Sequence, residues 1–79
     1  MSLISLKPGA RATITKFNGD DHDLATRLME MGLTIGSQIE IAYEAPFGGA
    51  IAIRCRGSLI ALRSTDAALI EVTPLKEQL

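Results

Sequence analysis

Apolar and polar residues alternate in short stretches along most of the chain. An alternation with a period of two is typical of β-strands that bury one face. It predicts five strands, at residues 11–17, 38–44, 50–56, 59–63 and 69–73. Residues 64–68 are expected to form a single 3₁₀ turn. Five strands this short cannot form a large two-layered sandwich, so we predict a mainly all-β fold, a small and strongly bent five-stranded barrel.

The apolar face of each predicted strand is expected to form the core. The residues expected to point inward are Ala12, Ile14, Ile39, Ile41, Tyr43, Ile51, Ile53, Cys55, Ile60 and Leu62. Ala52 is expected on the outward face, as is its neighbour Arg54. Phe17 falls on the face opposite to Ile14, so its burial would require a β-bulge near Lys16.

One segment has the period of a helix rather than that of a strand. A short α-helix, inserted after the first strand, is predicted for residues 23–31. Within it Leu24, Leu28 and Met31 recur at i, i+4 and i+7 and form one apolar stripe. Gly32 can adopt the left-handed conformation that ends a helix, in which case the next residue folds back onto Leu28 as in a Schellman motif.

Length and charge narrow the classes of function. The chain has 79 residues, enough for one domain, and a net charge of −1. Nucleic-acid-binding domains usually carry a basic stripe, whereas the eight lysines and arginines of this chain are spread out. Only Arg54 and Arg56 lie close together, and a solvated strand face is the favoured interpretation of this pair, with an anion site as the alternative. We therefore predict no nucleic-acid partner.

The single cysteine and the absence of long apolar runs indicate the cellular compartment in which the protein resides. Cys55 has no second cysteine to pair with, and its alternation with Ile51 and Ile53 predicts a buried structural thiol. A chain without disulfides suits a reducing compartment. No apolar run approaches the ~20 residues of a membrane span, and no signal peptide is evident. These observations predict a cytoplasmic protein without direct insertion into a membrane.

The sequence lacks the motifs of catalysis. Gly48-Gly49 is not followed by the Lys and Ser or Thr of a phosphate-binding loop, and no nucleophile is paired with a base. We therefore predict neither enzymatic activity nor a cofactor. Asp20, His22 and Asp23 are acceptable ligands for ferrous iron. The favoured interpretation of these residues is a helix N-terminus, where acidic side chains cap amides, so no metal site is predicted.

Four motifs in a fixed order resemble those of a known family. They are Leu6-Lys7-Pro8-Gly9, Leu28-Met29-Glu30-Met31-Gly32-Leu33-Thr34-Ile35-Gly36, Ala45-Pro46-Phe47-Gly48 and Ala67-Ala68-Leu69-Ile70-Glu71-Val72. Over roughly residues 6–72 the chain resembles the ferrous iron transport protein A (FeoA) family. It departs from the family pattern at Ile35, where proline is common, and at Gly49-Ala50, where Asp-Pro is common.

The resemblance implies a single SH3-like domain over residues 1–79, with a core at 6–73 and a flexible tail at 74–79. It implies an accessory protein of ferrous iron uptake, whose partner is the FeoB-type ferrous iron permease. The domain would dock on the cytoplasmic part of the permease and modulate it. The same barrel resembles the C-terminal domain of diphtheria-toxin-repressor-type regulators. A free-standing domain that binds a metal-dependent transcriptional regulator is therefore the alternative, and the oligomeric state stays open.

Two surfaces are candidates for the contact with a partner. The partner-binding candidates are Arg27, Met29, Glu30, Leu33, Pro46 and Phe47. Phe47 lies among glycines in a loop, and exposed aromatic residues are enriched at interface hot spots. The alternative is that Phe47 folds over one open end of the barrel. The other four residues belong to the outer face of the predicted helix and its end, for which a solvated face is the alternative.

Overall fold

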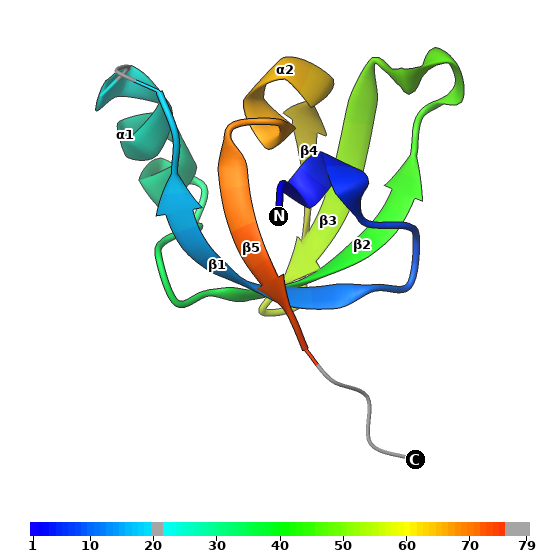
Figure 1. The fold of residues 1–79 in the computed structure, drawn as a ribbon, viewed down its shortest axis with the longest axis horizontal. Coiled ribbons are helices and arrows are strands. Elements are labelled where there is room, and N and C mark those ends of the chain that lie inside the picture. Colours follow the sequence, from blue (N-terminus) through cyan, green and yellow to red (C-terminus); the bar gives the residue numbers. More distant parts are fainter. Residues whose placement is uncertain (20–21, 76–79) are drawn as a thin grey trace.

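The computed structural model describes residues 1–19 and 22–75, and every predicted strand is present in it (Figure 1). The elements in chain order are η1 (Leu3–Ser5), β1 (Arg11–Phe17), α1 (His22–Glu30), β2 (Gln38–Glu44), η2 (Pro46–Gly48), β3 (Ala50–Cys55), β4 (Ser58–Arg63), α2 (Ser64–Ala67) and β5 (Ile70–Pro74). The turn expected at 64–68 is α-helical rather than 3₁₀. The expected tail is described only as far as Leu75, because residues 76–79 lie outside the described residues.

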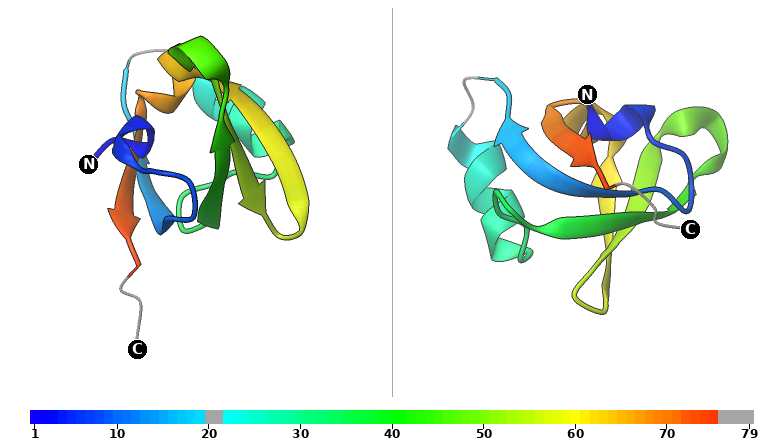
Figure 2. Two further views of the ribbon diagram at one scale, coloured as in Figure 1. Left: turned by 90° about the vertical axis from the view of Figure 1, so that its right-hand side faces the viewer. Right: turned by 60° about the horizontal axis from the view of Figure 1, so that its bottom comes forward.

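The five strands form one antiparallel sheet in the order β4-β3-β2-β1-β5. The sheet is curved, and in the left view of Figure 2 its edge strands β5 and β4 lie at its two sides and are connected through α2. Within the described residues no ladder joins β4 to β5, so the sheet is not closed by hydrogen bonds. The predicted five-stranded SH3-like fold is confirmed, in an open form.

The N-terminal segment and α2 pack together beside the edge strand β5. The η1 turn contacts both α2 and β5, and Ser2 forms an isolated bridge with Glu71. The Ser2 hydroxyl donates to the Ala68 carbonyl oxygen at 3.1 Å. Leu3 is fully buried and joins the core cluster. The core therefore includes a residue that precedes the expected range of 6–73.

The alternation of the strands correctly predicted most of the core, Cys55 included, and failed where β2 is irregular. Tyr43 was expected inside but its side chain is 53% exposed. The pairing of β2 with β3 shifts between Ile41 and Tyr43, and such an extra residue reverses the faces of the strand residues after it. Ala52 was expected outside but is buried, because its small side chain lies in register between Tyr43 and Ala61 on the two neighbouring strands.

A second irregularity lies in β1, where the sequence had indicated one. The register with β5 shifts between Ile14 and Lys16, which confirms the predicted β-bulge. Phe17 is consequently turned toward the core and packs against it while remaining partly exposed.

The helix α1 ends as the sequence predicted, with one correction to its apolar stripe. Gly32 has φ +93°, and its amide donates to the Met29 carbonyl at 2.9 Å. The Leu33 amide donates to the Leu28 carbonyl at 2.8 Å, which completes the Schellman motif. Met31 was expected in the core but is 46% exposed, since α1 ends before it. Leu33, folded back by the turn, is fully buried and completes the stripe.

No helix in the described part of the chain combines the length and apolar character that a membrane crossing requires.

Candidate docking surfaces

An apolar groove runs between α1 and the segment that follows its C-terminus. We call it the α1 groove, and its lining residues are Phe17, Ala25, Thr26, Met29, Leu33, Thr34 and Ile35. The Met29 side chain is 59% exposed and that of Ile35 is 63% exposed, whereas Leu33 beneath them is fully buried. The groove therefore has a floor that belongs to the core and two exposed apolar walls, one from the helix and one from the loop.

The loop wall of the groove is held by several hydrogen bonds. The Thr34 amide donates a hydrogen bond to the Ser37 hydroxyl oxygen at 3.1 Å, and the Ser37 amide donates to the Thr34 carbonyl oxygen at 3.0 Å. The Gly36 amide donates to the Ile14 carbonyl at 2.8 Å, which ties the loop to β1. Ser37 is itself buried. Ile35 is thus presented to solvent by a fixed backbone, and a partner would meet a preformed surface.

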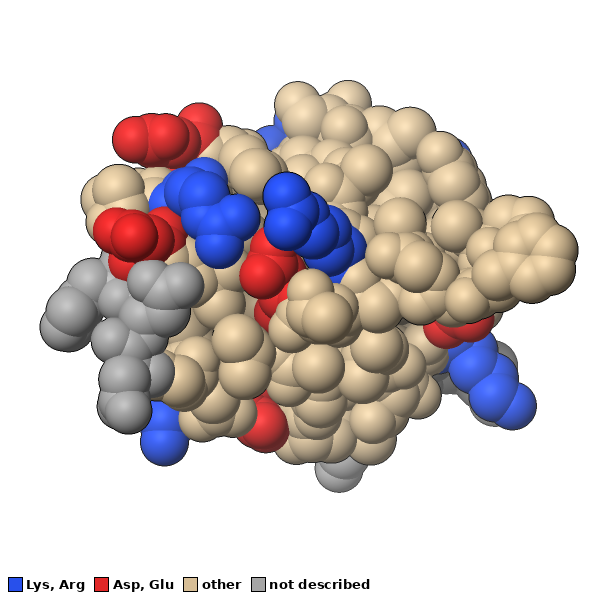
Figure 3. Space-filling model, turned by 90° about the horizontal axis from the view of Figure 1, so that it is seen from above, with Lys and Arg blue, Asp and Glu red and all other residues tan. Residues whose placement is uncertain are grey.

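The charged candidates on α1 do not line this groove. The Arg27 guanidinium lies 3.6 Å from the Asp66 carboxylate, and this pair links α1 to α2. Glu30 is exposed at the end of the helix. Figure 3 shows basic and acidic side chains intermingled on the side where α1 and α2 lie. The structure therefore brings Met29 and Leu33 together in an apolar groove and places Arg27 beside α2.

Phe47 lies at the tip of the loop between β2 and β3, and its side chain is fully exposed. It has φ +71°, which is unfavourable for a residue with a bulky side chain. Two bonds fix the ends of the loop: the Ala45 amide donates to the Ala50 carbonyl at 3.0 Å, and the Ser64 hydroxyl donates to the Gly48 carbonyl. The alternative, in which Phe47 folds over the open end of the barrel, is not the conformation observed.

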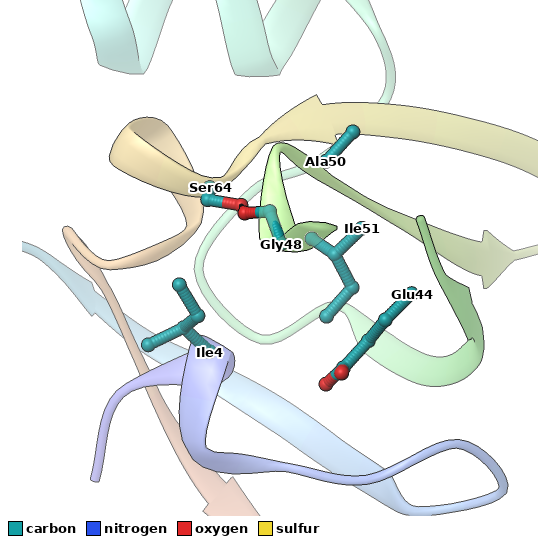
Figure 4. Close-up of a pocket in the computed structure, with 6 residues that line it drawn as sticks. All are labelled: Ile4, Glu44, Gly48, Ala50, Ile51 and Ser64. Carbon is teal, nitrogen blue, oxygen red and sulfur yellow. Dashed lines mark hydrogen bonds between the residues drawn. The ribbon is translucent and has the colours of Figure 1, made fainter. Parts of the chain in front are cut away.

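A small pocket lies under the Phe47 loop, between η1 and α2 (Figure 4). Its lining residues are Ile4, Glu44, Gly48, Ala50, Ile51 and Ser64. Among the described residues, Glu44 is the one ionisable side chain in this lining. The Ser64 hydroxyl in this lining donates its hydrogen bond to the Gly48 carbonyl oxygen.

The metal candidates are only partly described. Asp20 and the side chain of His22 lie outside the described residues, and Asp23 is exposed in the first turn of α1. Within the part of the chain that the structure describes, no group of three or more His, Cys, Asp or Glu side chains gathers as a metal site would require.

The two apolar candidate surfaces lie at opposite ends of the molecule. Figures 1 and 2 place α1 and η2 on opposite sides of the curled sheet. Sequence reasoning selected Met29 and Phe47 but missed Phe17 and Ile35. The signal for Ile35 was a large apolar residue next to a turn glycine, at the position where the chain departs from the family pattern. Phe17 had been considered only as a core residue.

Comparison with known proteins shows which family and which solved structures the chain resembles. It matches the FeoA domain over residues 1–74. The structure of the FeoA protein from Chlorobium tepidum has a TM-score of 0.89 and 34% sequence identity, and the match covers 96% of this chain and 71% of that chain. The iron(II) transport protein A from Clostridium thermocellum has a TM-score of 0.86 and 36% identity, with 95% and 46% covered. No match was found among curated proteins.

A manganese-dependent transcriptional repressor in complex with manganese has a TM-score of 0.89 at 21% identity, covering 95% of this chain and 36% of the repressor. At this identity the likeness shows a shared fold alone. The match to the FeoA domain covers nearly the whole chain, whose helix end and strands have the predicted form. The chain belongs to the FeoA domain family.

Proposed function

We propose that this protein is a cytoplasmic accessory protein of ferrous iron uptake, which docks on the cytoplasmic part of a FeoB-type permease through the α1 groove and modulates it. Membership of the FeoA family implies a role in ferrous iron transport. The observation that supports the docking site is the exposed apolar pair Met29 and Ile35 over a buried floor. An apolar groove with rigid walls is a typical binding site for an apolar segment of a partner.

The energetics favour a reversible contact. Burying what remains exposed of Met29 and Ile35 would contribute about 1–2 kcal/mol each. A domain of 79 residues offers a small interface, and small interfaces are typical of transient complexes. Such an accessory protein would bind and leave the permease as the state of the permease changes.

Titration calorimetry with the cytoplasmic domain of the permease, with and without guanine nucleotide, tests the proposal. We expect Met29→Ala and Ile35→Ala to weaken binding by about tenfold each, because each removes an apolar contact. Tyr43→Ala is the matched control, since Tyr43 is similarly exposed outside the groove.

If Phe47→Ala abolishes binding while Met29→Ala leaves it unchanged, docking occurs through the Phe47 loop and the proposed site is wrong. The absence of binding in every nucleotide state, to full-length permease as well as to its cytoplasmic domain, would contradict the proposed partner.

The second candidate function is binding to a metal-dependent transcriptional regulator. It is favoured by the fold that the chain shares with the manganese-dependent repressor. The same titration with such a regulator, with and without Mn²⁺, separates the two functions. Binding to the regulator but not to the permease would favour this candidate.

A further inference from the structure

A polar groove at the end of the sheet remote from α2 and η2 collects three arginines. Arg11 from β1, Arg54 from β3 and Arg56 from the turn between β3 and β4 line it together with Glu40 and Leu75. The hairpin turn that carries Arg56 projects at this end in Figure 2. We call this site the arginine groove.

The strand register places the charges of this groove in a row. Arg11 lies directly opposite Glu40 in the ladder between β1 and β2, and Glu40 lies opposite Arg54 in the ladder between β2 and β3. The three side chains therefore share one face of the sheet. Neighbouring strands are about 4.8 Å apart, so the backbones of Arg11 and Arg54 are separated by roughly 10 Å. Apolar residues flank the row: Leu75 beside Arg11 and the exposed Leu59 opposite Arg54.

The arginines of the groove form no ion pair with the residues that the structure describes. Among the described residues, the ion pairs join Met1 to Glu71 and Arg27 to Asp66, and none involves Arg11, Arg54 or Arg56. Among the described lining residues, three guanidinium groups and one carboxylate give an excess of positive charge, on a chain whose net charge is −1. The excess is thus a local feature of this end of the sheet and does not reflect a generally basic protein.

Arg56 also has an unusual backbone conformation. Arg56 has φ +53° and Gly57 has φ +82°, and together they form the two-residue turn between Cys55 and Ser58. Both central residues of such a turn require positive φ, which is why asparagine, aspartate or glycine usually occupies the first position. An arginine there has a conformational cost, and it places a third guanidinium at the rim of the groove. The arginine groove therefore combines guanidinium groups that form no ion pair with the described residues and a strained backbone at Arg56.

We propose that the arginine groove binds an acidic peptide segment of a protein partner, in which carboxylates alternate with apolar residues. Guanidinium groups recognise carboxylates through paired, charge-assisted hydrogen bonds. Glu40 in the middle of the row repels a continuous polyanion such as nucleic acid, but leaves room for separate carboxylates on either side. Leu59 and Leu75 lie at the two ends of the row and provide apolar surface for the ends of the bound segment.

The test is an NMR titration of the ¹⁵N-labelled full chain with the peptide acetyl-Glu-Leu-Glu-Leu-Glu-amide. Alternate side chains of an extended peptide lie about 7 Å apart on one face, a spacing that flexible arginines can reach. We expect shift changes at Arg11, Glu40, Arg54 and Gly57, and an affinity at least about tenfold higher than that of the same peptide with glutamine for glutamate. Added salt should weaken the binding.

Substitutions of charged residues inside and outside the groove test which side chains bind the peptide. The double substitution Arg11→Gln with Arg54→Gln should abolish the preference for the acidic peptide. Arg63→Gln is the matched control, because Arg63 is an exposed strand arginine outside the groove. Glu40→Gln should tighten binding severalfold by removing the repelling carboxylate, a gain that a damaged fold would not produce.

Four outcomes would overturn the proposal. The first is equal binding of the glutamine peptide, and the second is shift changes that lie away from the groove. The third is tighter binding of double-stranded DNA or of inorganic phosphate than of the peptide. The fourth is concentration-dependent shifts at the groove without any peptide, which would assign it to a second copy of the chain. None of these measurements uses the permease, so they stand apart from the proposed docking through the α1 groove.

Discussion

The Leu33 amide nitrogen lies 2.8 Å from the Leu28 carbonyl oxygen and donates a hydrogen bond to it across the end of α1. This bond reverses the chain direction and buries Leu33 against the core. The next residues of the chain run beside the helix and supply the loop wall of the α1 groove. A local helix-ending motif therefore creates the surface through which we expect a partner to dock.

Gly32→Ala should destabilise the protein by about 1 kcal/mol, because φ +93° at this position is unfavourable for a residue with a Cβ atom. No atom lies within 4 Å of the position that the new Cβ would occupy, so the cost is conformational rather than steric. Urea denaturation measures the change. Gly49→Ala is the control, since Gly49 has φ −80° and also has space for a Cβ. An equal loss for both substitutions would contradict the explanation.

Leu3→Ala should cost about 2–4 kcal/mol of unfolding free energy, since it leaves a cavity in the core where η1 packs against α2 and β5. The neighbouring Ile4 provides the comparison, because its side chain is 41% exposed. Ile4→Ala should cost less than about 1 kcal/mol in the same chemical denaturation experiment. Similar losses for the two substitutions would show that the N-terminal segment is not an integral part of the core.

Phe47→Gly should raise the melting temperature, because glycine adopts φ +71° without the strain that phenylalanine bears. The side chain is fully exposed, so its removal costs no core packing, and a gain of about 0.5–1 kcal/mol is expected. Phe47→Ala keeps the strained backbone and should leave stability nearly unchanged. A loss of stability with glycine would mean that Phe47 packs against the protein in solution.

Glu71 should titrate below its usual range. The main cause that lowers the pKa of this carboxyl is a hydrogen bond from the N-terminal ammonium, whose nitrogen lies 3.1 Å from Glu71 Oε2. A hydrogen bond of 2.8 Å from the side-chain amide of Asn18 to Glu71 Oε1 lowers the pKa further. Since the folded pKa lies below the unfolded value of about 4.3, the resulting stability is present above that pH and is lost as the pH falls through the lowered pKa. An NMR titration of the side-chain carboxyl measures this. Acetylation of the N-terminus should raise the pKa, and an unchanged pKa would rule out the ammonium as the cause.

Sequence patterns predicted the parts of the fold that depend on near neighbours. Alternation placed Ile39, Ile41, Ile51 and Ile53 inside correctly, because strands of this kind bury every second residue. It failed at Tyr43, since the extra residue in β2 is set by pairing with β3 and has no distinct local signature.

The candidate site was predictable only in part, for the same reason. Met29 could be assigned to an outer helix face, but the groove also needs Phe17 and Ile35. These come together through the bulge in β1 and the bond from Gly36 to Ile14, which are contacts between residues distant in sequence. Leu33 was expected to take part in the contact surface, and its burial results from the same fold-back that the sequence indicated.

The α1 groove and the Phe47 loop lie at opposite ends of the molecule, an arrangement suited to connecting two binding partners. A molecule seated in the α1 groove leaves the Phe47 loop in solvent, so the domain has room to hold two molecules, or two distant parts of one large assembly, at once. In the second case each contact would raise the effective concentration for the other, and two weak interfaces would act with an avidity that neither has alone.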